Sequence, residues 1–122
     1  MEKKDLKPAG VFKYFEEICQ VPRPSKKEEK MIVYLKAFGA KHNLETKVDE
    51  AGNVLIKKPA TPGKENLQTV VLQSHIDMVC EKNNDVQHDF LTDPIETEID
   101  GEWLKAKGTT LGADNGIGVA TE

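Results

Sequence analysis

An imidazole and a carboxylate stand two residues apart at the end of a short apolar run. The run is Val70–Leu72, and its composition predicts a strand buried on both faces. His75 could bind a metal ion through one ring nitrogen while Asp77 accepts a hydrogen bond from the other nitrogen. In open α/β sheets, ligands bind outside the carboxyl ends of the strands. This segment is therefore a candidate metal or catalytic site, although an incidental surface ion pair would have the same sequence.

A second candidate ligand lies in the glycine-rich segment 107–119. Asp114 is the only charged residue between Gly108 and Gly118, and glycine at this density lets a backbone approach a ligand closely. A carboxylate in such a loop can bridge two metal ions about 3.5–4 Å apart, as in aminopeptidase-type hydrolases. A catalytic zinc ion normally has three protein ligands and an open position. His75 and Asp114 would therefore form only part of a complete site.

Three further groups were weighed as functional residues. His42 is expected in the last turn of a helix, where a cation is favoured. His88 and Asp89 form a second possible ligand pair, but a loop turn with Phe90 directed inward is the favoured interpretation. Cys80 has no oxyanion-hole signature near it, and the chain contains no P-loop, no complete dinucleotide fingerprint and no nucleophile elbow.

Composition limits the possible classes of protein. The 122 residues suffice for one modest domain, and 38% apolar and 31% charged residues are typical of a soluble globular chain. The net charge of −4 and the scattered lysines argue against a nucleic-acid partner. There is no membrane-length apolar run and no signal peptide, so a cytoplasmic location with no membrane partner is expected. Cys19 and Cys80 are expected to be free thiols.

The remaining elements must position the candidate ligands, and they predict an α/β unit with helices packed on a mixed sheet. Helix-type spacing covers residues 9–20, and Ser25 with Glu28 predicts a capping box that begins a second helix ending near His42. Alternation and turn signals predict strands at 44–49, 54–56, 95–100 and 103–106, with a loop at 83–93. A last helix begins near Asn115 and has no stop signal before Glu122. We therefore expect the chain to be the N-terminal portion of a longer protein and the domain to be incomplete.

The chain resembles the aminoacyl-histidine dipeptidases, also called cytosolic non-specific dipeptidases, which belong to the co-catalytic zinc peptidases. The resemblance covers nearly the whole chain, and its segments are Pro22–Ser25, the Asp49…Gly52-Asn53 turn, QSHIDMV, HDF…DPI and LGADNGIG. The last segment is the most specific. It matches the dipeptidase branch, whereas the wider family has a Gly-Arg-Gly…Asp-Met-Lys-Gly pattern at that place.

The resemblance implies a role for each candidate residue. His75 would ligate one zinc ion, Asp77 would act in the catalytic machinery by orienting that imidazole, and Asp114 would bridge two zinc ions. It also implies a cis peptide bond after Asp114. Two zinc ions per complete site are implied, with cobalt or manganese as possible substitutes.

The implied activity is hydrolysis of dipeptides, of the Xaa-His type or with broad specificity, through a zinc-activated water. The general base and the remaining ligands would lie beyond Glu122, and the separate lid and dimerisation domain is absent from residues 1–122. The chain alone is therefore expected to be inactive, and a homo-oligomer is expected for the enzyme. Two alternatives stay open, namely another hydrolase of the same zinc family, such as a tripeptidase or deacylase, and a non-enzymatic α/β interaction module.

Overall fold

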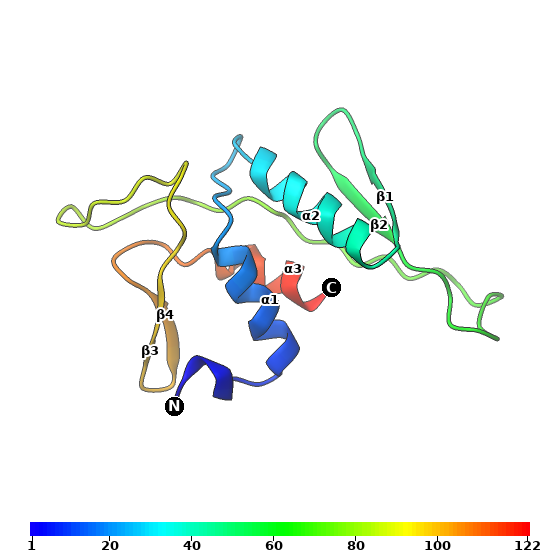
Figure 1. Ribbon diagram of the computed structural model, residues 1–122, viewed down its shortest axis with the longest axis horizontal. Coiled ribbons are helices and arrows are strands. Elements are labelled where there is room, and N and C mark those ends of the chain that lie inside the picture. Colours follow the sequence, from blue (N-terminus) through cyan, green and yellow to red (C-terminus); the bar gives the residue numbers. More distant parts are fainter.

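The computed structural model describes all residues from Met1 to Glu122. It has three α-helices, one short 3-10 helix and four short strands, and it belongs to the predicted α/β class (Figure 1). In chain order the elements are η1 (Lys3–Asp5), α1 (Ala9–Cys19), α2 (Glu29–Lys41), β1 (Glu45–Val48), β2 (Val54–Lys57), β3 (Thr97–Asp100), β4 (Trp103–Ala106) and α3 (Ala113–Thr121). No helix has the length and apolar character that crossing a membrane requires.

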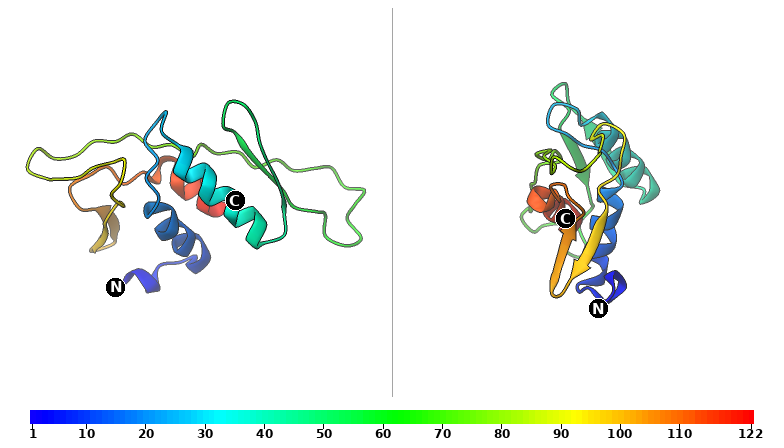
Figure 2. Two further views of the ribbon diagram at one scale, coloured as in Figure 1. Left: turned by 45° about the horizontal axis from the view of Figure 1, so that its top comes forward. Right: turned by 90° about the vertical axis from the view of Figure 1, so that its left-hand side faces the viewer.

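The core surrounds α1, whose apolar stripe packs against α3 and against the start of α2. The left view of Figure 2 shows these three helices between the two hairpins. The buried members come from α1, the start of α2, α3 and two loops: Phe15, Ile18, Cys19, Met31, Met78, Ile95 and Ala120. Both cysteines are free thiols, as predicted. This core is small, and it fixes the two segments that carry the candidate site.

The strands form two separate antiparallel hairpins. In one hairpin β1 pairs with β2, with Thr46 opposite Ile56, and in the other β3 pairs with β4, with Ile99 opposite Leu104. Each turn contains a glycine in the left-handed region, Gly52 in the first and Gly101 in the second. The four strands were predicted to within two residues, but no hydrogen bonds join the hairpins into one sheet.

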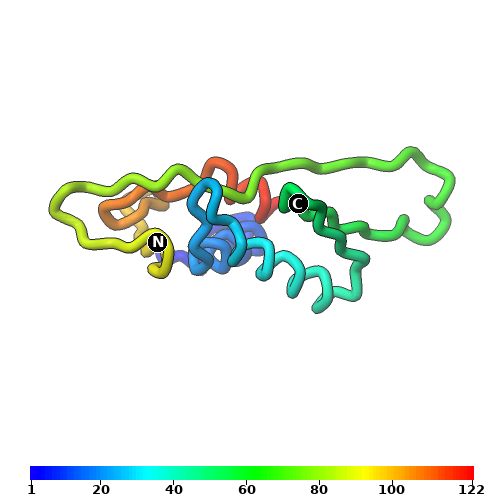
Figure 3. The backbone as a smooth tube through the Cα atoms, turned by 90° about the horizontal axis from the view of Figure 1, so that it is seen from above, coloured from blue at the N-terminus to red at the C-terminus, as the bar shows by residue number.

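The predicted strand through Val70–Leu72 is not formed, and its burial on both faces is wrong. These three residues are 64–80% exposed, and no backbone–backbone hydrogen bond involves Gln68–Asp77. The segment instead runs extended along one long side of the molecule (Figure 3). The physical reason is that a strand needs hydrogen-bonded neighbours on its edges, and residues 1–122 place none there.

The predicted capping box at Ser25 is also wrong. Helix α2 begins at Glu29, and its N-cap residue Glu28 makes no side-chain cap bond. The Glu28 carboxylate accepts a hydrogen bond of 2.6 Å from the backbone N–H of Lys26. The Ser25 hydroxyl instead donates to the side chain of Asp77. A long-range partner has therefore replaced the local one.

Candidate metal centre

The glycine-rich segment approaches the core so closely that only glycine fits at two positions. Gly112 has a φ of +74°, and a Cβ there would lie 2.7 Å from Nη2 of Arg23 and 2.8 Å from the sulfur of Met78. A Cβ at Gly116 would lie 2.6 Å from the same Nη2 atom and 3.1 Å from Phe15. Tight contacts of this kind therefore set the position of Asp114, which lies between the two glycines.

The structure brings His75, Asp77 and Asp114 together. His75 Nδ1 lies 2.9 Å from Asp77 Oδ1, and His75 Nε2 lies 2.9 Å from Asp114 Oδ1. The side chains of His75 and Asp77 are 49% and 33% exposed, and that of Asp114 is 96% exposed. Asp77 and Asp114 therefore flank the imidazole on its two nitrogens, with the Asp114 side open to solvent. The Asp114–Asn115 peptide bond is cis, as the resemblance implied.

Hydrogen bonding shifts the pKa of two groups in this arrangement. The contact with Asp114 raises the pKa of His75, and the contact with Asp77 raises it further. The hydroxyl of Ser25 lowers the pKa of Asp77, and His75 acts in the same direction. The carboxylate of Asp77 is thereby held in its charged form, which is the form that accepts a hydrogen bond from the imidazole.

The donor set fits a cation between His75 and Asp114. A neutral imidazole carries one N–H, and if Nδ1 donates it to Asp77 then Nε2 directs a lone pair at the oxygen of Asp114. Two lone pairs at 2.9 Å require a proton or a metal ion between them. Imidazole nitrogen and carboxylate oxygen are both ordinary zinc ligands. The chain contains no group of three or more His, Cys, Asp or Glu residues that could hold a metal, so a metal ion at this place would need further ligands.

The other candidates lie outside this cluster. His42 caps the C-terminal end of α2, as predicted, and its ring packs on Phe38 at a centroid distance of 4.4 Å. His88 packs on Phe90 at 4.4 Å, and its Nε2 atom is buried without a hydrogen-bond partner. The thiol of Cys80 points at the carbonyl of Met78, and burial raises its pKa, which disfavours the nucleophilic thiolate.

Sequence reasoning missed the importance of Arg23 and gave Ser25 the wrong role. Arg23 is 2% exposed and donates three hydrogen bonds to backbone carbonyls of the two segments that carry the cluster. Ser25 Oγ donates to Asp77 Oδ2 at 2.5 Å. One signal was available, since Arg23 stands between two prolines in a segment that belongs to no helix or strand.

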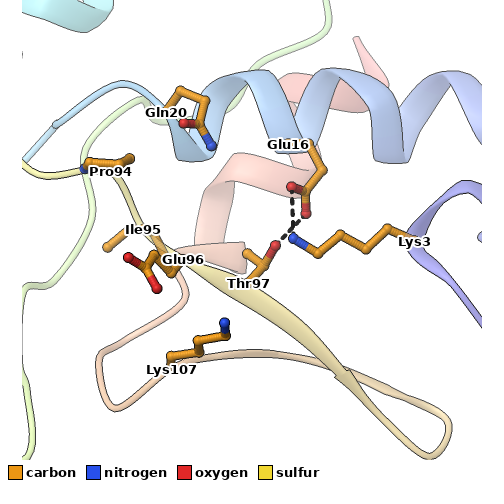
Figure 4. A pocket seen from close by; sticks show the side chains of 8 residues that line it. All are labelled: Lys3, Glu16, Gln20, Pro94, Ile95, Glu96, Thr97 and Lys107. Carbon is orange, nitrogen blue, oxygen red and sulfur yellow. Dashed lines mark hydrogen bonds and ion pairs between the residues drawn. The ribbon is translucent and has the colours of Figure 1, made fainter.

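A surface hollow of the chain lies away from this cluster. It lies between α1 and the β3 hairpin, and its lining is mostly polar: Lys3, Glu16, Gln20, Pro94, Ile95, Glu96, Thr97 and Lys107 (Figure 4). Within this lining, the carboxylate of Glu16 accepts hydrogen bonds from Lys3 at 3.3 Å and from Thr97 at 2.6 Å. None of the cluster residues lines it, so this hollow gives no support to a substrate site.

Comparison with known proteins finds a dipeptidase both by sequence and by structure. Over 120 residues, or 98% of its length, the chain is 51% identical to the cytosol non-specific dipeptidase of Escherichia coli strain K12. It superposes on the crystal structure of the aminoacylhistidine dipeptidase of Vibrio alginolyticus with a TM-score of 0.94 and 54% identity, over 99% of this chain. The chain matches a quarter of an aminoacylhistidine dipeptidase. No family model matches it.

The match confirms the resemblance to the aminoacylhistidine dipeptidases and defines its extent. The chain spans about 25% of the length of each of the two dipeptidases. Within that quarter the backbone of this chain is nearly the same as that of the solved dipeptidase. The remaining three quarters of each dipeptidase lie outside the match.

Proposed function

We propose that this chain supplies half of the dinuclear zinc site of a cytoplasmic dipeptidase. The observation that carries the proposal is the placement of His75 between two carboxylates, with Nε2 directed at Asp114. The similarity to two dipeptidases supports the reaction class. We further propose that residues 1–122 are the N-terminal portion of the catalytic domain, with the lid and dimerisation domain elsewhere.

Each residue of the cluster has a distinct part in this proposal. His75 would hold one zinc ion through Nε2, and Asp114 would hold that ion and share a second one. Asp77 would keep the proton of His75 on Nδ1, so that Nε2 stays free to ligate. Bound zinc would supply Lewis acidity for the peptide carbonyl and would lower the pKa of water. The substrate would be a dipeptide, and cobalt or manganese could replace zinc.

The test uses a chimaera in which this chain replaces the matched quarter of the Escherichia coli dipeptidase. The chimaera is expected to hydrolyse dipeptides in the presence of zinc, whereas the 122-residue chain alone is expected to be inactive. Loss of a metal ligand should cost more than the roughly 10–100-fold that loss of a ligand's hydrogen-bond partner costs. We therefore expect His75→Ala and Asp114→Asn to lower the activity of the chimaera more than about a hundredfold.

Two histidines outside the cluster provide matched controls. His42→Ala removes an exposed imidazole at a helix end, and His88→Ala removes the other candidate imidazole. Both variants should keep the activity of the chimaera. Equal losses for His88→Ala and His75→Ala would show that the ligand set is assigned wrongly. A panel containing dipeptides, tripeptides and acylated amino acids would distinguish the dipeptidase from a tripeptidase or deacylase.

A further inference from the structure

Arg23 is a buried cation whose hydrogen bonds all go to backbone carbonyls. It is 2% exposed, and its Nη1 atom donates to the carbonyls of Ile76 at 3.2 Å and of Asp77 at 3.1 Å. Its Nη2 atom donates to the carbonyl of Gly112 at 2.7 Å. Burying an ionised group is costly unless it is fully hydrogen-bonded. The buried guanidinium of Arg23 therefore joins two loops, the one after His75 and the one before Asp114.

The backbone of Arg23 holds the first of these loops as well. The N–H of Met78 donates to the Arg23 carbonyl at 3.0 Å, and Pro24 and Met78 form an isolated parallel bridge. On the other loop, a Cβ at Gly112 or at Gly116 would collide with the guanidinium. The planar fork of arginine can reach three acceptors in fixed directions, which a lysine ammonium cannot do in the same way. Arg23 thus sets the separation of the loops.

Ser25 holds the side chain of Asp77, in the loop after His75. Its hydroxyl lies 2.5 Å from Oδ2 of Asp77, and the other oxygen of that carboxylate lies 2.9 Å from Nδ1 of His75. Both oxygens of Asp77 are therefore fixed, one by a donor from the α1–α2 connection and one by the imidazole. A carboxylate held at both oxygens fixes the plane of the imidazole ring and its tautomer.

We propose that Arg23 and Ser25 are positioning residues for the metal centre, Arg23 by setting the distance between the His75 and Asp114 loops and Ser25 by fixing the carboxylate that orients His75. The proposal rests on the proposed function, since it assigns these residues to the same cluster. Neither residue would touch the metal or the substrate. Their effect would be on how well the two ligands are pre-aligned, and therefore on metal affinity as well as on rate.

The experiment measures zinc affinity of the chimaera by competition with a chromophoric chelator, and the absorption spectrum of the cobalt-loaded form. Ser25→Ala should weaken zinc binding about tenfold, the lower end of the range for hydrogen-bond partners of ligands. Ser25→Thr keeps a hydroxyl and should restore the affinity. Ser74→Ala is the matched control, since Ser74 precedes His75 but donates to Glu122 at 2.8 Å and not to Asp77.

Arg23→Lys should also weaken zinc binding about tenfold and should alter the cobalt spectrum, because the charge stays while the fork is lost. If Arg23→Lys does not fold, Gly116→Ala replaces it, since the added methyl would lie 2.6 Å from Nη2 of Arg23 and displace the guanidinium. The thermal midpoint of each metal-free variant is measured beside its zinc affinity. A lowered midpoint with unchanged zinc affinity would mean a merely structural role and would overturn the proposal.

The remaining outcomes separate this proposal from the proposed function. If the unaltered chimaera binds no zinc and hydrolyses no dipeptide, the proposed function fails and this proposal fails with it. If the chimaera is active and His75→Ala abolishes that activity, but Ser25→Ala and Arg23→Lys bind zinc as the unaltered protein does, this proposal alone is overturned. Equal weakening by Ser74→Ala and Ser25→Ala would overturn it too.

Discussion

Arg23 and Gly112 are 89 positions apart in the sequence, and the guanidinium of one donates a 2.7 Å hydrogen bond to the carbonyl of the other. This contact joins the loop after α1 to the loop before α3. It also explains why a glycine stands at position 112, where both the left-handed φ of +74° and the nearby guanidinium exclude a side chain. The glycine at position 112 is therefore required by packing against Arg23, in addition to any role that the glycine-rich segment has at the candidate metal centre.

Replacement of Gly112 by alanine is expected to destabilise the chain by about 2–5 kcal/mol. The left-handed backbone costs an alanine about 1–2 kcal/mol, and overpacking against Arg23 and Met78 adds about 1–3 kcal/mol. Urea unfolding followed by circular dichroism measures the change. Gly63→Ala is the matched control, because Gly63 has a φ of +85° and nothing within 4 Å of its added Cβ. Equal losses in both variants would contradict the contact with Arg23.

Zinc should stabilise the chimaera, and a chelator should remove that stabilisation. A ligand at about a hundred times its dissociation constant stabilises the native state by about 2.7 kcal/mol when the unfolded state does not bind it. The thermal midpoint of the chimaera should therefore rise with zinc and fall again with the chelator. In the His75→Ala variant, zinc should have little effect on the midpoint. An equal rise in both proteins would show that the metal binds elsewhere.

The 122-residue chain is expected to self-associate through the exposed segment around Val71. Val70, Val71 and Leu72 are 64–80% exposed and lie in an extended stretch with free backbone groups, which is a template for pairing with another strand. Val71→Lys should reduce the association seen by sedimentation velocity at increasing concentration. Val33→Lys is the control, since Val33 is 66% exposed on α2 and lies outside the segment. A clean monomer at high concentration of the unaltered chain would rule the idea out.

Stability should decrease at alkaline pH because of Cys19. Burial raises the pKa of this thiol to about 12 from an ordinary value of 9.0. The unfolded chain therefore releases the proton at lower pH than the native one, so the contribution is fully present below pH 9.0 and is lost as the pH rises towards 12. Over that window the free energy of unfolding should fall by up to about 1.4 kcal/mol per pH unit from this group.

Urea unfolding at pH 7, 9 and 10 measures this dependence. The Cys19→Ala variant should be less stable at every pH, because a buried side chain is truncated, but its slope above pH 9.0 should be shallower. Cys80→Ala serves as the control, because Cys80 is only half-buried and burial raises its pKa to a smaller extent. An unchanged slope in Cys19→Ala would disprove the assignment to this thiol.

Local patterns predicted the elements whose partners are close in the chain. The stripes of α1 and α2 and the two hairpins depend on neighbours a few residues away, and all four strands were located from alternation and turns. The pair formed by His75 and Asp77 was also predicted, because only one residue lies between them. Asp114 and His75, 39 positions apart, were combined in one site from their chemistry and from the family resemblance, and not from periodicity.

The predictions that were wrong concern residues whose partners are distant in the sequence. Ser25 has a local sequence typical of a helix cap, but its hydroxyl bonds to Asp77, 52 positions away. The run Val70–Leu72 has the composition of a buried strand, but residues 1–122 place no strand beside it, which leaves it exposed. Arg23 donates to three backbone carbonyls that are 53 to 89 positions away. Every residue has a backbone carbonyl, so residue types do not indicate which ones Arg23 contacts. Contacts at such separations are set by tertiary structure and are invisible to periodicity.

The unpaired segment also has a consequence for amide hydrogen exchange. No N–H from Gln68 to Asp77 donates to a backbone carbonyl, while the N–H of Met78 donates to Arg23. In the 122-residue chain, the amide of Asp77 should therefore exchange rapidly, whereas the amide of Met78 should be protected. In the chimaera the protected region should extend back towards Gln68, as new strands pair with the segment. The position of that boundary would show, for each amide, how much of the segment around His75 has gained hydrogen-bonded strand neighbours in the chimaera.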